Sequence, residues 1–310
     1  METWDLIIIG AGPAGLAAGV YAGRSGLKAL ILEEKMSGGE AAVAPWIENY
    51  PGFESISGPE LVEKMTAHCR KSGAQLNELE KVVLVDFRGE RKLVKTAKGE
   101  YSASAVIIAS GTKHRLLNVP GEQEFLGRGV SYCALCDGAF FKDKRVIVVG
   151  GGNSAAMTAR YLSNIAASVK LVHRREALRA DAASVETLRE QNVEFLLNSE
   201  VKEIKGDTIV KSIVLQNKST GELKELQTDG IFIQVGEEPN IQFLKEAGIT
   251  TDEGGYVIVD PRQRTNIQGV FAAGDVTNNT VKQVGTAVGQ AIVAATEAFR
   301  YTERPYYYKG

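Results

Sequence analysis

Two cysteines stand close together in the stretch SYCALCDG, which covers residues 131–138. Cys133 and Cys136 are three positions apart, and the only other cysteine of the chain is Cys69. A pair at this spacing can ligate a metal ion, form a redox-active disulfide or have no chemical role. Cysteine chemistry alone leaves these alternatives open, so the surrounding sequence must decide between them.

The composition limits the partners that the chain can have. Its 310 residues, of which 44% are hydrophobic, suffice for about two globular domains. The 36 Lys and Arg nearly balance the 38 Asp and Glu, so no basic field is available for nucleic acid or an anionic membrane. No apolar run reaches the about 18 to 20 residues of a membrane span, and METWDLIIIG does not resemble a signal peptide. We therefore expect a cytoplasmic protein whose partners are proteins or small molecules.

A first nucleotide-binding pattern lies near the N-terminus. The apolar run 6–9 predicts a buried strand, and a helical stretch and a second strand at 29–32 follow the glycines. In GxGxxG the glycines allow a tight turn, the approach of a diphosphate and close packing of the helix. Glu33 ends the second strand, where a carboxylate can bind ribose hydroxyls. The segment predicts a dinucleotide site that includes Gly10, Gly12, Gly15 and Glu33.

The pattern recurs in the middle of the chain. A strand at 146–149 precedes a GxGxxA variant, and a helical stretch and a strand at 169–172 follow it. The second strand ends at HRR instead of an acid, and guanidinium groups bind a 2′-phosphate that a carboxylate would repel. A merely solvated charge cluster is the alternative. We assign to this NADP site Gly152, Asn153, Ser154, Ala155, His173, Arg174, Arg175 and Arg179.

The C-terminal segment suggests what the first site holds. GVFAAGDVTNN places a strand at 269–273 before Gly274 and Asp275, and a helix is expected to begin at about Val284. An acid at a strand end can bind a polyol, and a helix N-terminus stabilises an anion. Both properties suit a flavin, which has a ribityl chain and an anionic reduced ring.

The order of the motifs resembles a known family. GAGPAG, IENYPGF, CxxCD, GGGxS with HRR, and AAGDV follow one another as in the low-molecular-weight thioredoxin reductases of bacteria and archaea, over nearly the whole chain. The resemblance implies an α/β homodimer whose subunits have two Rossmann-like domains. An NADPH domain carrying the CxxC, 118–241, would be inserted in a discontinuous FAD domain, 1–117 and 242–310. FAD would contact Gly10, Gly12, Pro13, Ala14, Gly15, Glu33, Gly39, Glu40, Asn49, Gly274, Asp275, Gln283 and Val284.

The chain departs from the family pattern at two places. Glu40 stands where Gln is usual, and a carboxylate there would disfavour negative charge on the flavin and lower its reduction potential. Asn153, Met157 and Thr158 replace residues that are often acidic, and relatives altered in this motif use NADPH poorly. A donor other than NADPH is therefore the alternative to the one that the HRR cluster favours.

The two cysteines can now be interpreted from their position. Cys136 lies 14 residues before Gly150, within the expected insert, while Cys69 and the three histidines are scattered along the chain. A zinc site needs about four ligands, which makes zinc a poor explanation. A disulfide near a flavin can accept an electron pair and pass it on by thiol exchange. The resemblance implies that Cys136 faces the flavin and that Cys133 attacks the partner disulfide.

Asp137 directly follows the pair. If this carboxyl is buried beside sulfur, its pKa rises and it can donate a proton to the leaving thiolate. The structural alternative for Asp137 is a helix N-cap.

Together these features predict a thioredoxin-disulfide reductase that uses NADPH and FAD and acts on thioredoxin or a glutaredoxin-like protein. A ferredoxin–NADP reductase would need no dithiol, and a dithiol oxidase would need no NADP site. A redox sensor with bound FAD is the remaining alternative, and turnover with a protein disulfide separates it from an enzyme.

Overall fold

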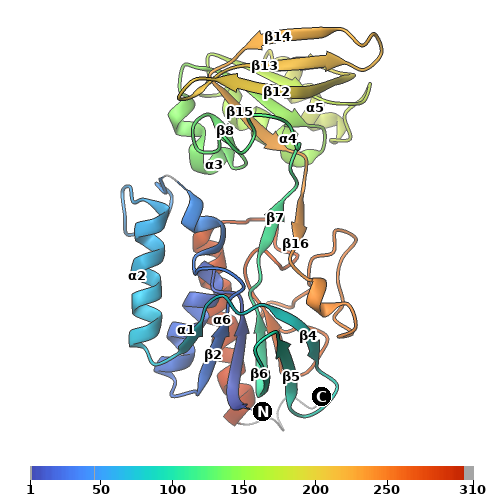
Figure 1. Cartoon of the computed structure of the whole chain (residues 1–310). Helices are drawn as coiled ribbons and strands as arrows, with labels where there is room; N and C mark the ends of the chain where they lie inside the picture. Colours follow the sequence, from blue (N-terminus) through green and yellow to red (C-terminus); the bar gives the residue numbers. More distant parts are fainter. Residues whose placement is uncertain (1, 45, 304–310) are drawn as a thin grey trace. The chain divides into compact units, whose positions relative to one another are not determined.

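The protein divides into two compact units. The computed structural model describes residues 2–44 and 46–303. Unit 1 comprises Met1–Lys113 and Glu238–Gly310, and unit 2, His114–Glu237, is inserted between these segments (Figure 1). The chain passes from unit 1 to unit 2 between residues 113 and 114 and returns between residues 237 and 238, in each case four residues before the expected boundaries 117/118 and 241/242. These boundaries fall in the strands β7 (Thr112–His114) and β16 (Glu237–Pro239), which pair with each other. Residues 304–310 of the expected last segment lie outside the described part.

Unit 1 is built on a seven-stranded sheet in the order β3-β2-β1-β6-β5-β4, with β17 also paired to β6. Its parallel strands are β1 (Glu2–Ile9), β2 (Ala29–Leu32), β3 (Gln75–Asn77), β6 (Glu100–Ile108) and β17 (Val270–Ala272). Two antiparallel strands, β4 (Val82–Asp86) and β5 (Lys92–Thr96), extend the sheet beyond β6.

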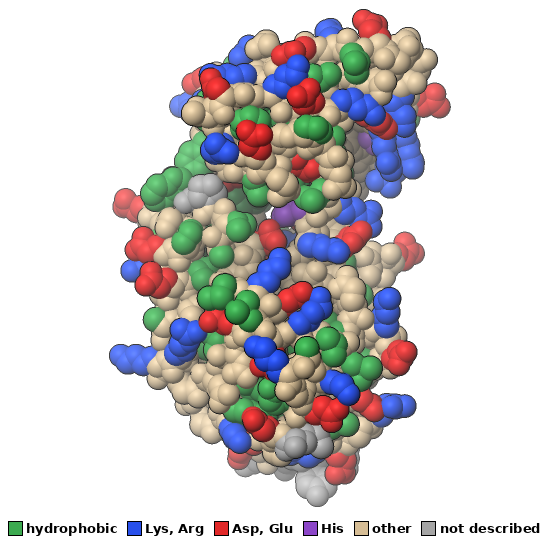
Figure 2. All heavy atoms as spheres, in the orientation of Figure 1, with side chains coloured by type: hydrophobic (Ala, Val, Ile, Leu, Met, Phe, Trp, Pro, Cys, Tyr) green, Lys and Arg blue, Asp and Glu red, His purple; other side chains and the backbone are tan. Residues whose placement is uncertain are grey.

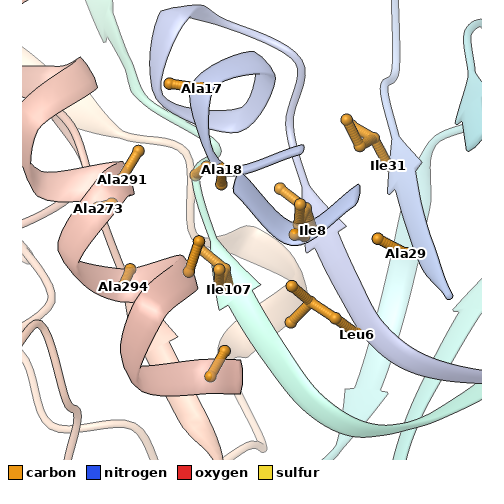
Figure 3. Close-up of a cluster of buried hydrophobic side chains, with 14 of the residues drawn as sticks. Leu6, Ile8, Ala17, Ala18, Ala29, Ile31, Ile107, Ala273, Ala291 and Ala294 are labelled. Carbon is orange, nitrogen blue, oxygen red and sulfur yellow. The ribbon is translucent and has the colours of Figure 1, made fainter. Parts of the chain in front are cut away.

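Alanine-rich helices cover one face of this sheet. In α1 (Pro13–Arg24) and α6 (Val284–Glu303), small side chains let the helix backbones approach each other and the strands closely. Figure 3 shows Ala18 of α1 and Ala291 of α6 near Ile107 of β6, in a core that also contains Leu6 and Ile8. The helix α2 (Gly58–Lys71) packs beside α1, and two short 3-10 helices, η1 (Gly39–Val43) and η3 (Gln242–Leu244), complete the unit.

Unit 2 has a five-stranded parallel sheet, β11-β10-β9-β15-β8, whose first four strands follow the same order along the chain as β3-β2-β1-β6 of unit 1. These strands are β8 (Val130–Ser131), β9 (Arg145–Gly150), β10 (Ser168–Val172), β11 (Glu194–Leu196) and β15 (Gly230–Gln234). Its helical segments are α3 (Ala134–Asp137), η2 (Gly138–Phe141), α4 (Asn153–Ser163) and α5 (Ala182–Glu190). A three-stranded antiparallel sheet, which the sequence analysis did not predict, comprises β12 (Ser199–Gly206), β13 (Val210–Asn217) and β14 (Leu223–Gln227).

The structure confirms the predicted fold class, an α/β chain with two Rossmann-like units. The expected strands at 6–9, 29–32, 146–149 and 169–172 lie within β1, β2, β9 and β10, and α6 begins at Val284 as predicted. The strand expected at 269–273 is present as β17, one residue shorter at each end.

The surface agrees with the near-neutral charge. On the face drawn in Figure 2, acidic and basic side chains are interspersed over most of the surface. Within the described residues, no helix combines the length and the apolar character that crossing a membrane requires.

Candidate active site and nucleotide sites

The glycine-rich turn of unit 1 lies between β1 and α1. A Cβ on Gly10 would lie 2.4 Å from the Ala109 carbonyl oxygen, and one on Gly15 would lie 1.8 Å from the Gly10 carbonyl oxygen. Both positions therefore require glycine for packing. Gly12 differs, because the nearest atom to an added Cβ is the Gly39 Cα at 4.0 Å. The space beside Gly12 fits the diphosphate of a dinucleotide.

Glu33 lies next to this turn. Its Oε2 accepts a hydrogen bond from the Ala11 amide (2.7 Å), and its Oε1 accepts one from the Lys35 amide (2.9 Å). These bonds hold the carboxylate at the end of β2, and a carboxylate has further lone pairs that can accept hydrogen bonds from ribose hydroxyls.

Segments far apart in the sequence meet beside the same turn. A Cβ on Gly39 would lie 3.4 Å from the Gly12 Cα, and one on Gly274 would lie 2.9 Å from the Ala14 Cβ. The Asn49 side-chain amide donates to Gln283 Oε1 (2.9 Å). The remaining expected flavin contacts lie within these segments: Pro13 begins α1, Val284 begins α6, Asp275 follows Gly274, and Glu40 is exposed in η1.

Lys282 is a residue of this region that the sequence analysis missed. Its ammonium group donates to the Asp275 carbonyl (2.7 Å) and lies 3.6 Å from the centre of the Tyr256 ring. These contacts fasten the segment before α6 to the loop after β17. Its position next to Gln283 was the only signal that could have pointed to it.

The second glycine-rich turn joins β9 to α4 in unit 2. A Cβ on Gly150 would lie 2.3 Å from the Gln234 carbonyl oxygen, and the methyl group of Ala155, which replaces the third glycine, is fully buried against this turn. No atom lies within 4 Å of a Cβ added to Gly152, so this turn also has space for a diphosphate. Asn153 and Ser154 are exposed in the first turn of α4.

The basic residues after β10 divide into two groups. Arg174, Arg175 and Arg179 are exposed, as a phosphate site requires, whereas only 6% of His173 is exposed. A Cβ on Gly151 would lie 2.3 Å from the His173 ring, which therefore packs directly under the turn. Burial and the three arginines lower the pKa of His173, so the imidazole is neutral at pH 7. It contributes packing to the turn and no positive charge.

The two cysteines form a disulfide in unit 2, with their Cα atoms 5.3 Å apart. Cys133 is the N-cap of α3, and its Sγ accepts a hydrogen bond from the Cys136 amide (3.2 Å). After reduction this amide would favour the thiolate form of Cys133.

Asp137 is the last residue of α3. It also occupies the N-cap position of η2, but its side chain makes no capping hydrogen bond, so the capping role considered above is not fulfilled. Burial raises the pKa of its carboxyl, and a hydrogen bond with Ser131 partly opposes this rise. A carboxyl that keeps its proton above the usual range can serve as a proton donor.

The residue before Cys133 is fixed by a network that the sequence analysis did not find. The Tyr132 ring stacks on His114 (4.6 Å between centres), and its hydroxyl donates to Glu122 Oε1 (2.9 Å). Gln234 Nε2 donates to the Tyr132 carbonyl (2.7 Å). These residues are too scattered in the sequence to form a motif.

Neither Cys69 nor a metal cluster extends the site. Cys69 is fully buried in unit 1, and burial raises its pKa to about 11, so its thiol is unreactive at neutral pH. In the described part of the chain, no three His, Cys, Asp or Glu side chains come together as metal ligands.

Comparisons with known proteins agree with this arrangement. The pyridine nucleotide-disulphide oxidoreductase family matches residues 4–291. A thioredoxin reductase of Bacillus subtilis is 45% identical over 304 residues, which cover 97% of this chain and 96% of the relative. The crystal structure of thioredoxin reductase from Streptococcus pyogenes has a TM-score of 0.91 at 42% identity, covering 97% of this chain and 99% of the other. The structure of thioredoxin reductase from Giardia duodenalis has a TM-score of 0.93 at 36% identity, and the match covers 98% of this chain and 100% of the other. The chain belongs to the pyridine nucleotide-disulphide oxidoreductases and, within them, to the thioredoxin reductases.

Proposed function

We propose that the chain is a thioredoxin-disulfide reductase, which transfers electrons from NADPH through FAD and the Cys133–Cys136 dithiol to the disulfide of a thioredoxin-like protein. The disulfide between Cys133 and Cys136, in the unit that also carries a glycine-rich turn and an arginine cluster, is the observation that carries the proposal. FAD and NADPH are its cofactors, and bound flavin supplies two-electron exchange between the nicotinamide and the disulfide.

Unit 1 holds FAD, and unit 2 holds NADPH. In unit 1 the space beside Gly12 receives the diphosphate, and Glu33 accepts hydrogen bonds from the adenosine ribose. Asp275 lies on the loop that Lys282 fastens and binds the ribityl chain. In unit 2 the space beside Gly152 receives the second diphosphate, and the exposed arginines bind the 2′-phosphate.

The dithiol residues have separate roles. Cys133 attacks the partner disulfide, since the Cys136 amide stabilises its thiolate. The thiolate leaving the partner takes a proton from Asp137, whose carboxyl stays protonated to a higher pH than usual. Cys136 then attacks Cys133 in the mixed disulfide, which releases the reduced partner and restores the Cys133–Cys136 disulfide.

The protein acts as a cytoplasmic homodimer. Exposed apolar side chains of unit 1, including Met36, Val43 and Trp46, support a protein interface. Light scattering on the FAD-loaded protein would give twice the chain mass of 33.4 kDa for a dimer.

Turnover tests the proposed activity. NADPH and a thioredoxin disulfide are supplied to the FAD-loaded protein and to its Cys133→Ser and Cys136→Ser variants. We expect reduction by the unmodified protein and none by either variant, although both keep FAD. Cys69→Ala is the matched control and should retain turnover, because Cys69 is buried in the other unit. Near-normal turnover by either of the two serine variants would contradict the proposal.

A further inference from the structure

The basic residues of unit 2 lie on a segment without helix or strand, here called the arginine segment (residues 173–181), between β10 and α5. The phosphate-binding role of these arginines belongs to the proposed function. How an irregular segment holds exposed guanidinium groups in place is a separate question, because a loop without such support would leave the arginines in many positions.

The first half of the segment is fastened to the strands beside it. The His173 amide donates to the Leu196 carbonyl, and the His173 carbonyl accepts from the Ser199 amide, both at 3.0 Å. The Asn198 amide donates to the Arg175 carbonyl (3.0 Å). Arg174 and Arg175 are therefore positioned by the β11–β12 connection.

The second half is fastened to the glycine-rich turn instead. The Gly151 carbonyl accepts hydrogen bonds from the Arg179 amide (2.6 Å) and the Ala180 amide (3.1 Å). Asn153 is the first residue of α4, and its side-chain Oδ1 accepts a hydrogen bond from the Asp181 amide (3.0 Å). Asp181 in turn is the N-cap of α5, and its carboxylate accepts a hydrogen bond from the Ser184 amide. Asn153 thus joins the start of α4 to the start of α5, with Arg179 directly before this junction.

We propose that Asn153 is a positioning residue for nucleotide selectivity: through the Asp181 amide it holds Arg179 where the 2′-phosphate binds. The inference rests on the proposed NADPH site and adds a residue that acts through another. A neutral amide suits this role, since it accepts the hydrogen bond without placing a second negative charge beside the diphosphate and the 2′-phosphate.

The test is a pair of binding measurements on the FAD-loaded protein, with NADP⁺ and with NAD⁺, which differ only in the 2′-phosphate. Asn153→Leu removes the acceptor at similar size. We expect it to weaken NADP⁺ binding about fivefold, as for one lost hydrogen bond, with NAD⁺ binding changed by less than about twofold. In an Arg179→Ala background the same substitution should have no further effect.

Two variants at Asp181 test the donor of the same hydrogen bond, the Asp181 amide. The φ of −61° at Asp181 is compatible with proline, so Asp181→Pro deletes the amide hydrogen, whereas Asp181→Ala keeps it and loses the same carboxylate. Asp181→Pro should bind NADP⁺ about fivefold more weakly than Asp181→Ala, with equal affinity for NAD⁺.

The outcomes separate this inference from the proposed function. Equal loss of both ligands in Asn153→Leu would mean that Asn153 contacts the shared diphosphate directly, and unchanged NADP⁺ binding would mean that the bond has no role. Either result would overturn the inference and leave the NADPH site in place. An unmodified protein that does not bind NADP⁺ more tightly than NAD⁺ would overturn both.

Discussion

Asn49 and Gln283 are 234 positions apart in the chain, and a hydrogen bond of 2.9 Å joins their side chains. Asn49 lies in the loop after η1, and Gln283 directly precedes α6. The bond joins the loop after η1, a short helix whose Gly39 lies beside Gly12, to the residue that precedes α6. FAD binding should therefore depend on this contact even though it lies between two protein residues.

Asn49→Leu should weaken FAD binding about fivefold to tenfold, because it removes one hydrogen bond and leaves Gln283 without this partner. Fluorescence titration of the FAD-free protein with FAD measures the change. Asn164→Leu is a control, since that exposed side chain bonds to the Arg160 carbonyl within its own helix end. If both variants bound FAD as the unmodified protein does, the two segments would not cooperate in holding the flavin.

A methyl group added at Gly12 or at Gly152 should impair binding at one nucleotide site and leave the other site intact. Gly12→Ala should fold normally and lose FAD affinity by more than about tenfold, because the methyl group occupies the space for the diphosphate and contacts no protein atom closely. Gly152→Ala should keep FAD and lose NADPH to a similar extent, since no atom lies within 4 Å of its added Cβ. Gly151→Ala is the contrasting variant, and its clash with His173 should lower the unfolding temperature. Loss of FAD from Gly152→Ala would reverse our assignment of the sites.

The raised pKa of Asp137 predicts a pH dependence of stability. A carboxyl whose pKa is higher in the folded state favours folding while it is protonated, and that contribution is lost as the pH rises from the ordinary value of 3.8 through the folded value. Asp137→Asn cannot ionise and should not show this loss. The difference in unfolding free energy, variant minus unmodified protein, should therefore be more positive at pH 7 than at pH 4.

Denaturant unfolding of the two proteins at both pH values measures this difference. Asp137→Asn should also slow thiol exchange, because the leaving thiolate loses its proton donor. A variant that loses stability more steeply than the unmodified protein between pH 4 and pH 7 would contradict the assigned direction of the shift.

The repeated βαβ pattern could be predicted because its signals are local. Apolar runs, glycine spacing and the residue at the end of the second strand lie within about thirty residues, which is the size of the unit that they specify. In both units the two strands of this pattern pair in parallel, β1 with β2 and β9 with β10.

The contacts that complete each site could not be predicted in the same way. Tyr132 with Glu122, and Lys282 with Tyr256, depend on how separate elements pack, and their spacing fits no motif. His173 is instructive, because the sequence pattern assigned it to the NADP site together with the arginines that follow it. Only the packing under Gly151 distinguishes the buried ring from them.

Trapping a mixed disulfide tests most directly whether the dithiol delivers electrons to a protein. A thioredoxin that lacks its resolving cysteine is joined through its remaining cysteine to thionitrobenzoate and mixed with the Cys136→Ser variant. The Cys133 thiolate should displace thionitrobenzoate and form a covalent adduct, which peptide mass spectrometry should locate at Cys133, and Cys133→Ser should form far less. Attachment at Cys69, or equal adduct in both variants, would contradict the account.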